Sequence, residues 1–210
     1  MTRAAGVYAF VLMLTGFFIS GCATTFQGGS DVAQGRQALF RSDYPTALVH
    51  FQNAEQAGPN YVYGTELREG VLSYLGRAQY LNGQLAPART TLQQALVAHR
   101  SDNLGRLYLG LTLARQGDQK AAGAEVQTAL KGMNDFLNYI INTFQNTFGS
   151  FWDQNGSLRK SITANQMLIT SGSFDWSTLI PNLEKLAMNY EQVEDLANQD
   201  QRQFIEMNQP

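Results

Sequence analysis

One segment of the chain is repeated, and this repeat limits the possible fold more than any other feature of the sequence. The stretch "YLGRAQYLNGQLAPARTTLQQAL" at residues 74–96 aligns without gaps with "YLGLTLARQGDQKAAGAEVQTAL" at residues 108–130. Every aligned position is shifted by 34 residues, and four pairs of identical small residues align: Gly76 with Gly110, Gly83 with Gly117, Ala88 with Ala122 and Ala95 with Ala129. Self-similarity with a period of about 20–50 residues is typical of stacked units that share one core. We therefore expect the chain to stack copies of one helical unit.

A third copy precedes these two. It keeps the same internal spacing at four positions, which are Gly35, Ala47, Phe51 and Ala54. Its offset from the next copy is 41 residues, so about seven residues, in "NYVYGTE", are inserted between them. Small residues at these positions let two helices approach closely, while the larger residue fills the space between them.

The 34-residue period, with its Leu-Gly, Ala, Phe or Leu, Ala and Pro pattern, resembles the tetratricopeptide repeat, a helix–turn–helix unit. The resemblance implies an all-α fold: a short right-handed solenoid of about three helix hairpins over residues 31–132. Gly83 and Gly117 would end the first helix of their hairpins, because glycine accepts the left-handed conformation found there. Residues 133–210 would form a C-terminal helical cap, since a stack of repeats must cover its last apolar face.

An aromatic stripe follows the repeats. In residues 135–153, apolar side chains recur every four positions: Phe136, Ile140, Phe144 and Phe148. This spacing is typical of one face of a helix. The helix is either a buried cap or an aromatic wall of a lipid or small-ligand pocket near residues 136–152.

Two more helices are expected before the C-terminus. One lies around Ser161–Ile169, and the other begins at Asp175 or Ser177, both of which are good N-cap residues. Apolar residues of the last helix alternate spacings of four and three over two heptads. That stripe packs on its own domain or forms the seam of an oligomer.

The N-terminus carries an apolar run that ends at the single cysteine of the chain. The run, from about Gly6 to Ile19, is shorter than the ~20 residues of a transmembrane helix and suits a secretory signal. It ends in "ISGC", with Cys22 last. The alternatives are therefore a cleaved signal or a signal anchor with a buried cysteine.

The "ISGC" sequence resembles the lipobox of bacterial lipoproteins. The resemblance implies that residues 1–21 are a signal peptide and that Cys22 receives a diacylglycerol and an N-acyl chain. Ala23 follows where an inner-membrane retention signal would place Asp, so the resemblance favours the periplasmic face of the outer membrane. Residues 22–30 would then be a lipidated N-terminus and a flexible tether.

Charge narrows the choice of partner. The chain has 15 basic and 17 acidic residues, and residues 134–210 carry four basic against nine acidic side chains. No basic face of the kind that binds phosphate backbones is present, so nucleic acid is not expected. The acidic segment after Glu191 is interpreted as a solvated helix face or a frayed tail.

Catalytic and metal-binding patterns are poor. His50 and His99 have no acidic or cysteine partner at ligand spacing in the sequence. Ser157–Lys160 matches the S-x-x-K motif of penicillin-binding enzymes, but the other motifs of those enzymes do not follow in order. We therefore expect no enzymatic activity, no metal and no cofactor besides the covalent lipid.

The concave face of the stack is the candidate site. First helices of the repeats place Arg and Tyr side chains there, a composition that is typical of recognition sites. The candidate partner-binding residues are Arg36, Tyr74, Arg77, Tyr80, Tyr108 and Arg115. Either they bind another cell-envelope protein, or they contact the C-terminal helices or solvent. The first alternative predicts an adaptor or assembly factor anchored in the outer membrane.

Overall fold

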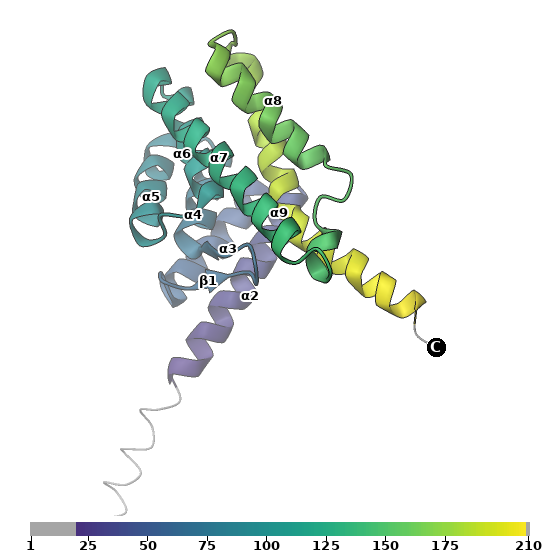
Figure 1. The fold of residues 1–210 in the computed structure, drawn as a ribbon. Helices are drawn as coiled ribbons and strands as arrows, with labels where there is room; N and C mark the ends of the chain where they lie inside the picture. Colours follow the sequence, from purple (N-terminus) through teal and green to yellow (C-terminus); the bar gives the residue numbers. More distant parts are fainter. Residues whose placement is uncertain (1–19, 209–210) are drawn as a thin grey trace, which may run out of the picture.

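The computed structural model describes residues 20–208, with side chains from residue 27 onward. The signal peptide expected at residues 1–21 therefore lies almost wholly outside the described residues, and so does the side chain of Cys22. The described chain is almost entirely helical, as expected for an all-α fold (Figure 1). Its helices are α2 (Ser20–Phe40), α3 (Tyr44–Ala57), α4 (Val71–Leu81), α5 (Leu85–Ala98), α6 (Asn103–Arg115), α7 (Gln119–Thr143), α8 (Ser157–Ser171) and α9 (Trp176–Met207).

The first six of these helices form three consecutive hairpins, and the same contact recurs inside each. A glycine of the first helix lies against a large side chain of the second, in the pairs Gly35–Phe51, Gly76–Leu92 and Gly110–Val126. A Cβ atom at Gly76 would lie 2.5 Å from Leu92 Cγ, so only glycine fits without a shift. The sequence alignment therefore identified the contacting positions of all three hairpins.

The turns of the hairpins also repeat. Gly83 and Gly117 adopt φ values of +75° and +88°, and Ser42 takes the same place in the first hairpin with φ +58°. The Gly83 N–H donates to the Tyr80 carbonyl oxygen, and the Gln84 N–H donates to the Gln79 carbonyl oxygen. This double closure satisfies carbonyls that the helix end would leave free.

The seven-residue insertion between the first two copies supplies the first strand and part of the turn of a small β-hairpin. Strand β1 (Val62–Tyr63) pairs antiparallel with β2 (Glu69–Gly70), and Val62 faces Gly70. The sequence placed the insertion correctly but did not predict strands. This hairpin has a role in the candidate site.

Two boundaries differ from those expected. Residues 22–30 belong to α2 and do not form an irregular tether. Gly28 packs close to α3, because a Cβ atom at this position would be in van der Waals contact with Ala57 Cβ. Helix α7 is continuous for 25 residues, so the repeats and the cap are not separated near residue 132. The helix ends at Thr143, and a 3-10 turn at Phe148–Phe151 follows, so the aromatic stripe leaves the helix half-way.

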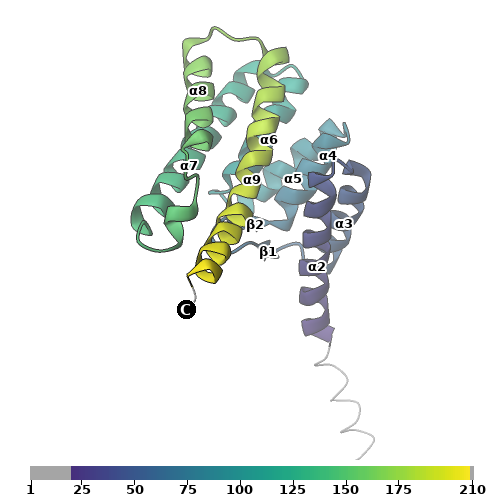
Figure 2. The same ribbon diagram turned by 90° about the vertical axis from the view of Figure 1, so that its right-hand side faces the viewer.

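The C-terminal helices form the cap. Gly156 and Gly172, both with φ +67°, bound α8, and the Asp175 side chain caps α9 by accepting the Ser177 N–H. Figure 2 shows α9 running between the first two hairpins (α2–α5) and the α7–α8 pair. Among residues 20–208, no helix combines the length and apolar character that a membrane span requires.

Candidate functional site

The concave face of the hairpins brings the six candidate residues together, but it is not open. Helix α9 lies across it, and Arg77 is 1% exposed and Tyr80 0% exposed. Tyr74 and Tyr108 are equally buried, and only Arg36 and Arg115 keep partial exposure. Of the two alternatives drawn from the sequence, contact with a C-terminal helix describes the structure, and the expectation of an exposed groove was wrong.

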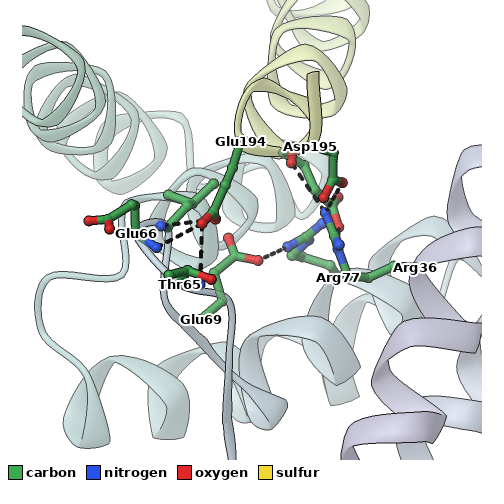
Figure 3. Close-up of polar contacts among 9 residues, drawn as sticks. Arg36, Thr65, Glu66, Glu69, Arg77, Glu194 and Asp195 are labelled. Atoms are coloured by element: carbon green, nitrogen blue, oxygen red, sulfur yellow. Dashed lines mark hydrogen bonds and ion pairs between the residues drawn. The ribbon is translucent and has the colours of Figure 1, made fainter. Parts of the chain in front are cut away.

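Two arginines of the repeats hold α9 through its carboxylates. Arg77 of α4 donates to Glu69 Oε2 at 2.8 Å and to Glu191 of α9 (Figure 3). Arg36 of α2 donates to Glu191 Oε1 at 3.2 Å and to Asp195 Oδ2 at 2.7 Å. Glu191 is 1% exposed and accepts from both arginines, so it is the centre of the network.

Aromatic rings complete the surroundings of these cations. The Arg77 guanidinium carbon lies 4.9 Å from the ring centre of Tyr74 and 5.4 Å from that of Tyr108. Arg115 lies 4.5 Å from the ring of Tyr80. Faces of aromatic rings attract cations, more strongly where water is excluded. The Arg and Tyr pairs are therefore an internal packing arrangement.

A second, more exposed contact joins the second and third hairpins to the first part of α9. The Tyr80 hydroxyl donates to Glu184 Oε1 at 2.5 Å, and Arg115 Nη2 donates to the same oxygen at 2.6 Å. Arg115 and Glu184 are 38% and 25% exposed, so water screens this pair more than the Arg77 pairs.

The β-hairpin fastens α9 from the other side. Both carboxylate oxygens of Glu194 accept backbone N–H groups of the turn between β1 and β2, at 2.7–3.2 Å (Figure 3). The donors are the successive residues Thr65, Glu66 and Leu67. The insertion between the first two copies therefore serves as a clamp on the C-terminal helix.

Burial and charge act in opposite directions in this network. Burial lowers the pKa of Arg77, but Glu191, Glu69, Tyr108 and Tyr74 together raise it more, so the pKa lies above its ordinary value. Burial raises the pKa of Glu69 to about 7, because Arg77 offsets this effect only in part while Asp102 and Glu191 add to it. Carboxylates outnumber guanidinium groups here, and one of them is therefore close to taking up a proton near neutral pH.

The carboxylates are the functional residues that sequence reasoning missed. The segment after Glu191 was interpreted as solvated or frayed, yet Glu191 and Glu194 are buried. The excess of acidic residues in 134–210 was the available signal, since the candidate residues on the repeats include three arginines.

The aromatic stripe packs into the cap instead of lining a deep cavity. The Phe136 ring lies 5.8 Å from that of Trp152 and 6.5 Å from that of Tyr190, and Trp152 is 2% exposed. A hollow of about 400 Å³ lies beside Phe151 and Leu158, and its lining mixes these apolar side chains with Asp153 and Asp200. This lining differs from an apolar lipid pocket.

One histidine has a partner that the sequence did not indicate. His50 Nδ1 lies 3.0 Å from Asp31 Oδ1, which joins α3 to α2. Within the described residues, no three His, Cys, Asp or Glu side chains are grouped so that they could hold a metal ion.

No protein family model matches the chain, and no curated protein or solved structure shows significant similarity to it.

Proposed function

We propose that the protein is a periplasmic lipoprotein of the bacterial outer membrane that acts as an adaptor or assembly factor for another cell-envelope protein. In this proposal Cys22 carries the lipid, and the three hairpins form a tetratricopeptide-like solenoid. The observation that carries the proposal is the recurrent glycine contact within all three hairpins. Stacks of such units serve widely as rigid binding surfaces.

Because α9 occupies the groove, we place the proposed partner surface on the C-terminal helices. In its C-terminal part, α9 bears apolar side chains that are about half exposed or more: Leu196, Phe204, Ile205 and Met207. Figure 1 shows this end of α9 extending beyond the body of the protein. Exposed apolar groups gathered on one element are typical of interaction sites. The partner therefore binds the end of α9, and the six residues of the groove act by positioning that helix.

The fold also bears on the anchor. The backbone of Cys22 lies within α2, six residues before Gly28, which lies next to Ala57 of α3. A lipid on Cys22 would hold the repeat body close to the bilayer, with little slack from a tether. Two or three acyl chains suffice for stable attachment, whereas one is marginal.

The anchor is tested by Cys22→Ser. The variant should lose metabolic labelling with a fatty acid, remain unprocessed and leave the outer-membrane fraction. A processed Cys22→Ser protein that still fractionates with the outer membrane would contradict the anchor.

The partner surface is tested by photo-crosslinking in intact cells. A p-benzoylphenylalanine at position 204 should give one discrete adduct with an envelope protein. The matched control places the same residue at Val97, which is 81% exposed on α5, and should give none. No adduct at position 204, or the same adduct at both positions, would overturn the assignment of this surface.

The alternative of a lipid or small-ligand pocket near residues 136–152 has less support. Phe136, Trp152 and Tyr190 pack against one another, and the neighbouring hollow has a mixed lining. We therefore retain the adaptor as the proposed function.

A further inference from the structure

A small cavity next to the Arg77 network has chemistry that the network itself does not use. It has a volume of about 320 Å³ and lies between the end of the β-hairpin, the turn before α6 and helix α9. Glu69, Asp102 and Tyr190 form its buried end, while Arg68 and Ser101 lie exposed at its mouth. The three buried residues come from three different segments of the chain.

Each buried residue contributes one polar atom that has no hydrogen-bond partner within the protein. These atoms are Glu69 Oε1, Asp102 Oδ2 and the Tyr190 hydroxyl oxygen. The second oxygen of Glu69 is held by Arg77, and the second oxygen of Asp102 accepts the Gly105 N–H at 2.7 Å. Each carboxylate is thus held in place by one oxygen, and its other oxygen has no hydrogen-bond partner.

Such an arrangement is costly without a ligand. A buried polar atom that lacks a partner destabilises the folded protein, and a charged group does so more strongly. Arg77, the nearest cation, already serves Glu69 and Glu191. Burial raises the pKa of Asp102, and the Gly105 N–H, the Ser73 hydroxyl, Arg77 and His99 together offset this rise only in part. The positive charge near Glu69 and Asp102 is therefore too small to balance both buried carboxylates.

The walls decide which cation fits. Leu67, Leu104 and the ring of Phe136 line the cavity together with the Tyr190 ring. Ca²⁺ and Mg²⁺ take six or more ligands, which two free carboxylate oxygens and one phenol do not supply, and within the described residues no three His, Cys, Asp or Glu side chains are grouped to hold another metal ion. An ammonium group accepts two carboxylates and a phenol oxygen as hydrogen-bond acceptors, and its alkyl stem contacts apolar and aromatic walls.

We infer that this cavity binds a primary ammonium group on a short alkyl chain, with the ammonium between Glu69 Oε1, Asp102 Oδ2 and the Tyr190 hydroxyl. The ligand is either a free alkylamine or a lysine side chain of a partner protein. The inference does not depend on the lipid anchor or on the end of α9 as a docking surface.

The test is a titration of the full chain, with binding followed by NMR. The two probes are n-butylammonium chloride and Nα-acetyl-lysine methylamide, and 1-butanol is the neutral control. Both amines should bind saturably, and 1-butanol should not. If the lysine derivative binds at least as tightly as n-butylammonium, the site serves a peptide lysine, and if only n-butylammonium binds, the site serves a free amine.

Asp102→Asn is the main variant, because asparagine is an equally good N-cap and keeps the start of α6 intact. It should weaken n-butylammonium at least tenfold, and Tyr190→Phe should weaken it several-fold. Asp135→Asn, which changes a carboxylate that is 58% exposed, should have no effect. Absence of saturable binding of both amines, equal binding of 1-butanol, or unchanged affinity in a folded Asp102→Asn variant would overturn the inference.

Discussion

The seams inside the hairpins and the contact between the hairpins and α9 are held together in opposite ways. Each seam places a glycine against one large apolar side chain, and the arrangement recurs three times. The contact with α9 occurs once and uses arginines, carboxylates and a tyrosine that lie between 69 and 159 residues apart in sequence. Apolar packing tolerates small errors, whereas a buried charge requires each partner to be present.

This difference assigns different tasks to the two regions. The seams build a scaffold from local contacts within each unit. The charged contact determines where α9 lies, and therefore where the exposed end of α9 is presented. A substitution in the seams should lower stability moderately, while a substitution in the charged contact should release α9 as well.

Arg77→Met should have the largest effect. It leaves Glu69 and Glu191 buried without their shared cation, and removal of one member of a buried ion pair costs about 3–5 kcal/mol. Urea unfolding followed by circular dichroism measures this loss. Arg100→Met, which alters an exposed arginine, is the control and should change stability by less than about 0.5 kcal/mol. Equal stability of the two variants would show that Arg77 does not hold the contact.

Ala88→Leu should have the next largest effect, in the seam. Ala88 and its equivalents Ala47 and Ala122 are all 0% exposed, so a larger side chain overpacks the hairpin by about 1–3 kcal/mol. Ala86→Leu changes an exposed position two residues earlier and should be nearly neutral. An unchanged urea midpoint for Ala88→Leu would contradict the alignment of the repeats.

Glu69→Gln should alter how stability depends on pH. The folded pKa of Glu69 is raised from 4.5 to about 7, so the folded state holds a proton that the unfolded state releases between these values. The contribution of Glu69 is therefore complete below about pH 4.5 and is lost as the pH rises through about 7. A single group changes the unfolding free energy by at most about 1.4 kcal/mol per pH unit.

The measurement is the difference in unfolding free energy between the parent and Glu69→Gln at pH 5, 6, 7 and 8. Relative to Glu69→Gln, the parent should lose stability across this range. Asp102 and Glu191 face the same group and remain in both proteins, so the difference isolates Glu69. Parallel curves would contradict the raised pKa.

Arg115→Ala should have the smallest effect, about 0–1 kcal/mol, because its pair with Glu184 is partly exposed and screened by water. High salt should reduce the loss further. Lys131→Ala, in an exposed pair with Asp135, provides a baseline near zero. A loss as large as that of Arg77→Met would mean that burial does not distinguish the two ends of the contact.

The same contrast explains what the sequence could predict. The seam contacts, the turns at Gly83 and Gly117 and the position of the insertion follow from spacing, because local geometry imposes them. The six candidate residues were correctly placed on one face for the same reason. Their environment was not predictable, because Glu191 and Asp195 come from a helix whose direction depends on long-range contacts.

Local sequence patterns also gave a wrong prediction where a helix includes residues of low helix propensity. Residues 22–30 contain "GGS", which favours a flexible segment in isolation, yet Gly28 and Gly29 pack close to α3 and Tyr61. Tertiary contacts override low helix propensity in such segments. The strands at Val62–Tyr63 and Glu69–Gly70 are two residues each and leave no periodic signal in the sequence.

The most direct test of the contact between the concave face and α9 is a double-mutant cycle on Arg77 and Glu191, which are 114 residues apart in sequence. The stability of Arg77→Gln, Glu191→Gln and the double variant is measured against the parent by urea unfolding. If the two side chains are paired in the buried network, the double variant should be less destabilised than the sum of the single variants by about 1–3 kcal/mol. Effects that add to within about 0.5 kcal/mol would show that α9 does not lie in the groove, and would contradict the proposed positioning of its exposed end.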